Sequence, residues 1–164
     1  MTEGMTLGKS IDLTFSRFSE RPAVTFCRKG AIETEMTFGA LLRSINRAAG
    51  NFKDMEIVKG DRVILFLPKS LFFMIAHLGL QKLGAISVPL NTGFKKGEME
   101  YFIRDSAPKL IIAGREQGPL TRDTAQGIKT IVVDTDMPFD ADSLFPEASE
   151  RDPDITVGPD DDKR

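Results

Sequence analysis

Two side chains of the types that most often carry nucleophilic or metal chemistry occur once each: His77 and Cys27. A Ser-His-Asp triad needs its histidine at a strand end or in a loop. His77 instead falls within the most apolar helical stretch, which favours a packed or helix-surface histidine. One His and one Cys cannot form the usual zinc ligand sets. Cys27 lies in a short strand-like run, where a small buried residue is expected, and a single cysteine excludes an internal disulfide.

The acids Glu98 and Glu100 also fail to make a catalytic pair. They are two positions apart on an expected helix, so they face different directions, and we expect a solvated face. The sequence contains no G-x-G-x-x-G after a strand, no G-x-x-x-x-G-K-[ST] and no G-x-S-x-G. These absences argue against a Rossmann-type dinucleotide site, a P-loop NTPase and a nucleophile elbow. These residues and motifs, taken alone, do not indicate a particular reaction.

The elements that would position a site alternate between strands and helices. Apolar, β-branched runs at 62–67, 86–90, 109–113 and 128–133 are typical of strands. Helical patterns at 70–83 and 96–105 separate the first three, and a loop with a short helix near Thr121 precedes the last. This order predicts an α/β fold: a doubly wound, mainly parallel sheet flanked by helices, with a ligand crevice at the carboxyl ends of the strands. Helix 70–83 is apolar nearly all round, which predicts deep burial or packing by a partner domain.

A smaller unit precedes this sheet. Runs at 23–27 and 32–36, joined by Arg28-Lys29-Gly30, predict a small N-terminal β-hairpin. A weak helical pattern comes before it, and Asp12 is expected to support the N-terminus of that helix. Thr37 is the expected N-cap of a strongly amphipathic helix that follows the hairpin.

The charge is unevenly spread along the chain. Residues 1–133 hold 19 of the 22 bases and 13 of the 24 acids, a net charge of +6, whereas residues 134–164 carry −8. The basic part could favour an anionic ligand such as a nucleotide, or could be a solvated surface that an acidic tail balances. The bases are scattered, which argues against nucleic-acid binding. We expect an α/β domain over 1–133 and an acidic, Pro/Asp-rich mobile linker over 134–164.

Targeting signals are not apparent. The N-terminus lacks the apolar region of a signal peptide, and no apolar run is long enough for a transmembrane segment. These features predict a cytoplasmic protein.

The stretch from Gly60 to Ala113 resembles the N-terminal subdomain of the adenylate-forming (AMP-binding) acyl-CoA synthetases, a superfamily that includes long-chain fatty acid CoA ligases. The resemblance extends over about residues 10–135 at the level of pattern. It is specific between Gly60 and Ala113 because order, spacing and residue identity agree together. The family-typical features are Gly60-Asp61-Arg62-Val63, Leu67-Pro68, Gly84-Ala85, Val88-Pro89-Leu90-Asn91, Asp105-Ser106, the strand at Leu110 and, upstream, Met36-Thr37-Phe38.

The resemblance implies a two-step ligase. A carboxylic acid substrate attacks the α-phosphate of MgATP to give an acyl-adenylate and pyrophosphate, and the thiol of coenzyme A (CoA) then displaces AMP. The implied cofactors are therefore ATP, Mg and CoA, and the implied partners are the remaining subdomains of the same ligase. Such chemistry depends on positioning and on electrostatic stabilisation of phosphates.

The sequence departs from the family pattern at its end. The family's Gly/Ser/Thr-rich phosphate loop is expected shortly after 157–161, and the sequence ends at Arg164. The adenine-site, ribose-binding and catalytic-lysine motifs are also missing. We therefore expect a fragment, either cut at a subdomain boundary or a truncated gene product. It is expected to hold no catalytic residue, to be inactive alone and to bind none of these cofactors tightly.

One functional contact is implied by position in related CoA ligases. Thr92, Gly93 and Phe94 fall in a loop that approaches the CoA nucleotide, and Arg115 and Arg122 fall where bases approach its phosphates. The alternative is a plain turn glycine with solvated arginines. For the whole chain, the alternative is a stand-alone α/β nucleotide-binding or protein-interaction module without catalysis. These residues indicate neither the acyl substrate nor the oligomeric state.

Overall fold

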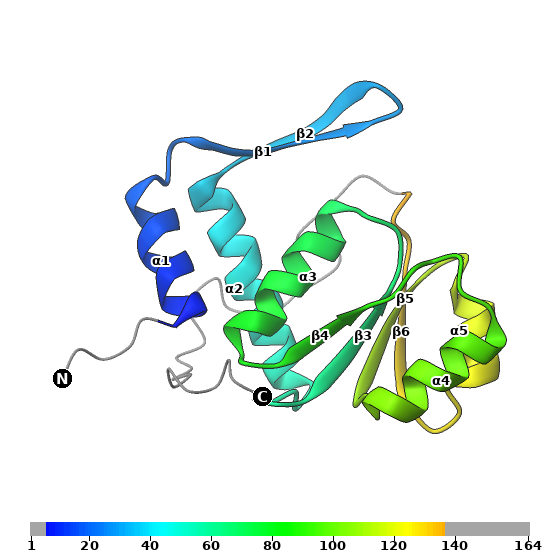
Figure 1. The fold of residues 1–164 in the computed structure, drawn as a ribbon. Helices are drawn as coiled ribbons and strands as arrows, with labels where there is room; N and C mark the ends of the chain where they lie inside the picture. Colours follow the sequence, from blue (N-terminus) through cyan, green and yellow to red (C-terminus); the bar gives the residue numbers. More distant parts are fainter. Residues whose placement is uncertain (1–5, 137–164) are drawn as a thin grey trace.

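In the computed structural model, which describes residues 6–136, a four-stranded parallel sheet has helices on both faces, and a two-stranded hairpin stands beside it (Figure 1). The strand order is β4-β3-β5-β6. The expected fold class is therefore confirmed. The strands are β3 (Arg62–Phe66), β4 (Ile86–Pro89), β5 (Leu110–Gly114) and β6 (Lys129–Val133). Residues 137–164, which include most of the predicted linker, lie outside the described part of the chain.

Successive side chains of the central strands enter two different cores, because side chains alternate between the faces of a sheet. Val63 and Leu65 of β3 belong to one cluster, and Ile64 and Phe66 belong to the other. All four are fully buried. A strand that is covered on both faces needs an unbroken apolar run, which is why the sequence from 62 onward predicted it so clearly.

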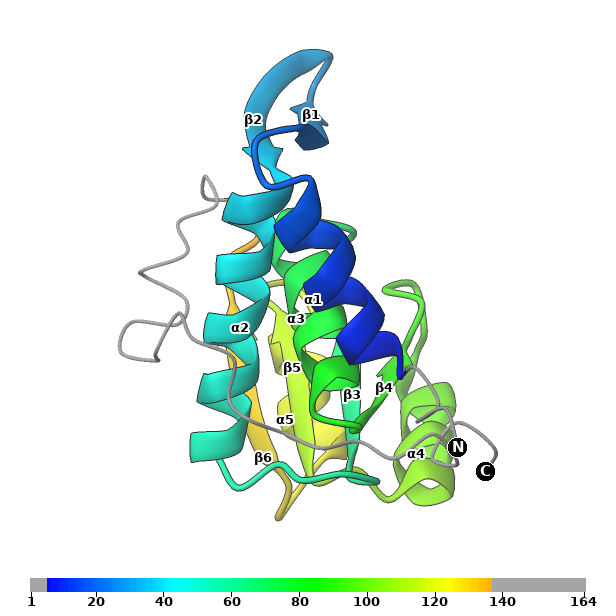
Figure 2. The same cartoon turned by 90° about the vertical axis from the view of Figure 1, so that its left-hand side faces the viewer.

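Helices form the outer layers. One face of the sheet is covered by α2 (Phe38–Asp54) and α3 (Leu71–Lys82), with α1 (Leu7–Arg17) packed on the outside of these two helices, and the other face is covered by α4 (Lys96–Ser106) and α5 (Gly118–Thr124) (Figure 2). The expected cap at Thr37 is confirmed, since its hydroxyl accepts a hydrogen bond from the Ala40 N–H at 3.2 Å. Ser70 caps α3 in the same way through the N–H of Phe73. No helix within residues 6–136 has the length and apolar character needed to cross a membrane.

The expected hairpin is formed by β1 (Pro22–Arg28) and β2 (Ala31–Thr37), which pair in antiparallel fashion. Lys29 and Gly30 both have positive φ, as a tight hairpin turn requires. Cys27, however, is exposed, and the expectation of burial is wrong. The hairpin projects away from the sheet (Figure 1), so the outward side chains of its strands face solvent.

The first helix also differs from expectation in one detail. Its N-terminus is capped by Thr6, whose hydroxyl accepts from the Lys9 N–H, and not supported by Asp12. Asp12 lies in the middle of α1, because the helix begins several residues earlier than the pattern indicated. Its carboxylate accepts a hydrogen bond from the buried ammonium of Lys82 on α3. The Lys82 ammonium also donates to the side-chain oxygen of Asn46 on α2, so the contact joins three helices.

Candidate functional site

The carboxyl ends of the parallel strands meet at one edge of the sheet, which is where open α/β folds bind ligands. The segments that leave this edge are 67–70 after β3, 90–95 after β4, 115–117 after β5 and 134–136 after β6. The predicted residues Thr92, Gly93, Phe94 and Arg115 lie in these segments. The strand order therefore brings the two predicted groups to the same edge. Strand β3 lies between β4 and β5, so the two strands from which these groups leave are about 10 Å apart.

The loop after β4 is a tight turn organised by Asn91. The side-chain oxygen of Asn91 accepts from the Gly93 N–H at 2.9 Å, and its carbonyl accepts from the Phe94 N–H at 3.0 Å. Thr92 and Gly93 are exposed to solvent. A β-carbon on Gly93 would meet only the Asn91 side-chain oxygen, at 3.3 Å. The turn therefore presents accessible backbone at the carboxyl edge.

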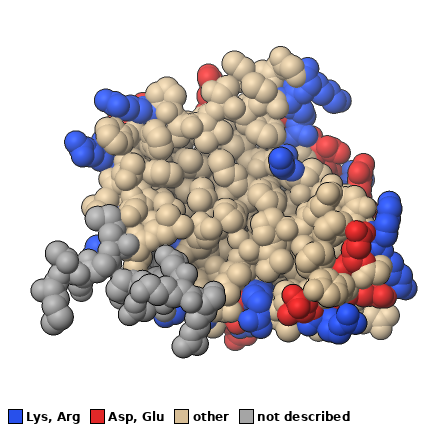
Figure 3. All heavy atoms as spheres, viewed as in Figure 1, with Lys and Arg blue, Asp and Glu red and all other residues tan. Residues whose placement is uncertain are grey.

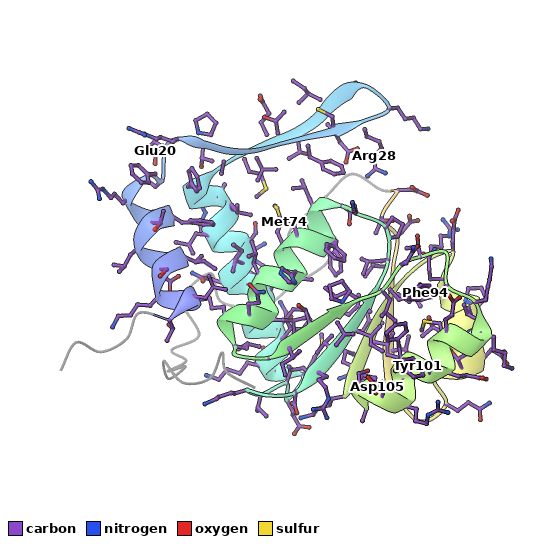
Figure 4. The ribbon with its side chains drawn as sticks, viewed as in Figure 1. Glu20, Arg28, Met74, Phe94, Tyr101 and Asp105 are labelled. Carbon is purple, nitrogen blue, oxygen red and sulfur yellow. The ribbon has the colours of Figure 1, made fainter. Side chains whose placement is uncertain are left out.

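Phe94 anchors this turn to α4. Its ring stacks on Phe102 with centroids 5.3 Å apart and planes 6° from parallel. The ring of Tyr101 packs edge-on against the ring of Phe102. Figure 4 shows Phe94, in the turn, and Tyr101, on α4, on the same side of the molecule. Phe94 is half-buried and packs against the core beneath α4, so it fixes the loop and offers a ligand only part of its ring.

Arg115 follows β5 directly and forms an ion pair with Asp134 at the end of β6, with 2.9 Å between guanidinium nitrogen and carboxylate oxygen. The Arg115 side chain is 76% exposed. The next residue along, Thr135, accepts a hydrogen bond from Arg28 of the hairpin at 2.8 Å. Hydrogen bonding to Glu33 raises the pKa of Arg28, so this arginine is charged at every relevant pH. The segment after β6 is therefore held by two arginines.

Arg122 does not join the other predicted residues at the edge. It lies on α5, exposed, with a guanidinium nitrogen 3.6 Å from where a β-carbon on Gly118 would be. On the same outer layer, Lys96 of α4 pairs with Asp123 of α5 at 2.9 Å. The hydrogen bond that the Lys96 ammonium donates to the Asp123 carboxylate raises the pKa of Lys96. Arg122 is thus part of the helical layer that α4 and α5 form, and it does not lie at the carboxyl edge of the sheet.

One polar side chain at this edge was missed by the sequence analysis. Gln117 is buried, and its Oε1 has no hydrogen-bond partner in the part of the chain that the structure describes. The oxygen lies 2.4 Å from where a β-carbon on Gly114 would be, so a larger residue at 114 would displace the end of the Gln117 side chain. Nothing in the local sequence marks Gln117, because burial of this side chain follows from how the loop after β5 folds.

His77 is a packed residue, as the sequence predicted. Its Nδ1 lies 2.7 Å from Ser87 Oγ on β4, and its Nε2 lies 3.0 Å from the Gln81 side-chain nitrogen. The ring also stacks on Phe73. Burial lowers the pKa of His77. With Gln81 donating to Nε2, the neutral imidazole carries its proton on Nδ1 and donates to Ser87, an arrangement that joins α3 to β4.

An open parallel sheet whose accessible loops gather at its carboxyl edge belongs to the α/β class of proteins, in which ligands bind at that edge. Comparison with known families identifies the family of the chain. The family model described as "AMP-binding enzyme" matches residues 12–163, and the chain belongs to this family.

Individual relatives agree with the family match. The long-chain-fatty-acid–CoA ligase FadD13 of Mycobacterium tuberculosis is 35% identical over 88 residues, which are 54% of this chain and 18% of that protein. The crotonobetaine/carnitine–CoA ligase of Salmonella paratyphi A is 30% identical over 127 residues, which are 77% of this chain and 25% of that protein. The chain thus spans about a quarter or less of these curated relatives.

A solved structure shows the same fold. The N-terminal domain of FACL13 from Mycobacterium tuberculosis superposes with a TM-score of 0.81 at 24% identity. The match covers 98% of this chain and 40% of that domain's chain. The architecture described above is therefore that of one part of a larger N-terminal domain.

Proposed function

We propose that this chain is the N-terminal α/β subdomain of an ATP-dependent acyl-CoA ligase. In this proposal residues 1–133 form the subdomain and 134–164 lead to the rest of the enzyme, which works in the cytoplasm. The observation that supports it most directly is the match of residues 12–163 to the AMP-binding enzyme family, together with relatives that are named as CoA ligases. The chemistry is formation of an acyl-adenylate from a carboxylic acid and ATP, then transfer of the acyl group to CoA.

The role proposed for this chain is to contact the nucleotide part of CoA at the carboxyl edge. The exposed backbone at Thr92 and Gly93 would lie against the ligand, and the edge of Phe94 would line it. Arg115 would pair with its phosphates at this edge, and Arg122, on α5, would pair only with a phosphate that extends beyond the edge along that helix. Two features support this role: the Asn91-centred turn leaves the backbone accessible, and the Arg115 guanidinium is largely exposed although Asp134 contacts it. Phosphate binding would compete with that ion pair.

Metal binding is not assigned to this chain. Within residues 6–136, no group of three or more His, Cys, Asp or Glu side chains could hold a metal ion. Magnesium would come with ATP to other parts of the ligase.

The activity is tested on the product of the complete reading frame. Purified enzyme is incubated with ATP, Mg, CoA and a panel of carboxylic acids that includes fatty acids of several lengths and a carnitine-type acid. We expect pyrophosphate release and acyl-CoA formation with at least one acid, and neither with the 164-residue chain alone. Robust pyrophosphate release by the 164-residue chain would overturn its proposed inactivity. A complete product without adenylation activity would favour a binding module.

The CoA contacts are tested in the same enzyme by Arg115→Ala and Arg122→Ala. Loss of a charge-assisted contact to phosphate should raise the KM for CoA about tenfold and leave the KM for ATP unchanged. Arg104→Ala is the matched control, because Arg104 is an exposed arginine near the other end of α4. An unchanged KM for CoA in a variant would remove that arginine from the proposal.

A further inference from the structure

The segment that follows β6 is held by two arginines that come from different elements. Arg115, directly after β5, donates from Nη1 to Oδ2 of Asp134 at 2.9 Å. Arg28, the last residue of β1, donates from Nη2 to the carbonyl of Thr135 at 2.8 Å, and its Nη1 lies 3.5 Å from Oδ1 of Asp136. Figure 4 labels Arg28 between the hairpin and the end of β6. The hairpin therefore reaches the carboxyl edge of the sheet through this side chain.

The two arginines are connected through Asp134. Its Oδ2 contacts Arg115, and its Oδ1 accepts a hydrogen bond from the Asp136 N–H at 3.0 Å. A carboxylate that bonds the backbone N–H two residues further on forms a compact turn. Arg28 holds the two residues after Asp134, so it also restricts the positions that the Asp134 carboxylate can take. A continuous chain of contacts thus runs from the hairpin to Arg115.

Arg28 is well suited to hold this segment because its own position is fixed. Its Nε and Nη2 both donate to the carboxylate of Glu33 across the hairpin. Bidentate pairs of this kind are specific in geometry, and the two side chains are only 29% and 16% exposed. Arg115 differs, since its side chain is 76% exposed and exposed ion pairs contribute little stability. An anionic ligand can therefore compete for Arg115, but it meets a carboxylate that Arg28 keeps close by.

The surface around this network carries charge of both signs. In Figure 3, Lys and Arg gather at the upper right, where Figure 1 places the tip of the hairpin, and Asp and Glu lie just below them. The middle of the same face is formed almost entirely by uncharged residues. Basic groups near the hairpin tip are thus opposed by carboxylates, so a phosphate meets competition there and not a purely basic surface.

We propose that Asp134, held by Arg28, competes with the phosphates of CoA for Arg115. Carboxylate and phosphate oxygens bind a guanidinium in the same way, so each contact that Asp134 retains is one that the ligand must replace. Tethering raises the effective concentration of the carboxylate at Arg115, and Arg28 shortens the tether. Arg28 is accordingly a positioning residue, which acts on the ligand through Asp134. The inference rests on the proposed contact between Arg115 and CoA, and the test separates the two.

The test measures the Kd for CoA by isothermal titration calorimetry in the product of the complete reading frame. Asp134→Asn should lower the Kd about threefold, because the amide no longer competes as an anion for Arg115. The double variant Arg28→Ala/Glu33→Ala frees the segment without changing the net charge and should lower the Kd about twofold. Glu116→Gln is the matched control, since it removes an exposed carboxylate next to Arg115 in the sequence, and it should change the Kd less.

A second arm links the effect to its site. In the background of Arg115→Ala, Asp134→Asn should leave the Kd unchanged, since nothing remains to compete for. A Kd that rises or stays the same in Asp134→Asn, or that falls equally in Glu116→Gln, would overturn the proposal. A fall that persists in the Arg115→Ala background would also overturn it, because the effect would be one of general charge. An unchanged Kd in the double variant would remove Arg28 from the proposal.

Arg115→Ala alone tests the contact on which the inference rests. A raised Kd in this variant, together with an unchanged Kd in Asp134→Asn, removes the competition and keeps the CoA contact. An unchanged Kd in Arg115→Ala removes both. Asp134→Asn leaves the pair between Arg28 and Glu33 in place, so it decides the question even where circular dichroism shows that the double variant does not fold.

Discussion

A β-carbon on Gly79 of α3 would lie 3.0 Å from the β-carbon of Ala48 on α2. It would also lie 3.2 Å from the backbone nitrogen of Ala49. Both alanines are fully buried. The two helices therefore approach closely enough here that α3 needs a glycine.

Gly79→Ala should accordingly destabilise the chain. The added methyl group forces the helices apart, and overpacking of this kind costs about 1–3 kcal/mol in the free energy of unfolding. Urea denaturation followed by circular dichroism measures the loss. Gly97→Ala is the control, since a β-carbon there meets nothing within 4 Å and alanine favours a helix by up to about 1 kcal/mol. Similar effects of the two substitutions would contradict the close contact.

The buried Lys82 gives a second prediction. Its side chain is 3% exposed and its ammonium is paired with Asp12, whose side chain is 29% exposed. Asp12→Ala leaves a buried ammonium without its carboxylate and should cost about 3 kcal/mol of stability. Lys82→Met removes the buried charge itself and leaves Asp12 access to water, so it should cost less. A chemical-denaturation series in which Lys82→Met is the more damaging change would refute this ordering.

The fold was predictable because its main determinants are local in sequence. The apolar run from 62 places residues in both cores by simple alternation, and the structure ends that strand at Phe66, within one residue of the expected position. Caps such as Thr37 and Ser70 act on residues three positions away. The strand order then brings Thr92 and Arg115 to one edge, as parallel sheets require.

What sequence reasoning missed depends on contacts between distant residues. Asp12 meets Lys82 across 70 positions, and Arg115 meets Asp134 across the ends of two strands. The side-chain oxygen of Gln117 occupies space that a β-carbon at Gly114 would need. Cys27 is exposed because its hairpin stands off the sheet, and strand propensity carries no information on that placement.

His77 should make stability depend on pH. Burial lowers its pKa below 6.5 in the folded state, so the unfolded chain binds the proton more readily. The stability that neutral His77 contributes is complete above the pKa that this residue has in the unfolded chain. It is lost as the pH falls through the pKa that the residue has in the folded state. Urea midpoints between about pH 8 and about pH 5 should therefore fall more steeply for the natural chain than for His77→Gln. Parallel pH profiles for the two proteins would show that His77 is not the titrating group.

Asp61 titrates in the same sense at lower pH, at the opposite edge of the sheet from the candidate site. Burial alone would raise the pKa of Asp61, but hydrogen bonds from the Val58 N–H and the Lys109 ammonium outweigh it, and the pKa is lowered below 3.8. The distances are 2.8 Å to Val58 N and 2.9 Å to Lys109 Nζ. These contacts close the turn that leads into β3.

Because its folded pKa is lowered, the Asp61 carboxylate stabilises the fold above its unfolded pKa, and this contribution is lost as the pH falls through the folded value. Asp61→Asn should therefore cost about 1 kcal/mol near pH 7, and the difference from the natural chain should shrink below about pH 4. Guanidinium denaturation at several pH values measures both quantities. Glu100→Gln, at an exposed carboxylate on α4, is the control and should change little at any pH. A penalty for Asp61→Asn that stays constant down to about pH 3 would mean that the turn depends on hydrogen bonding alone and not on the charge.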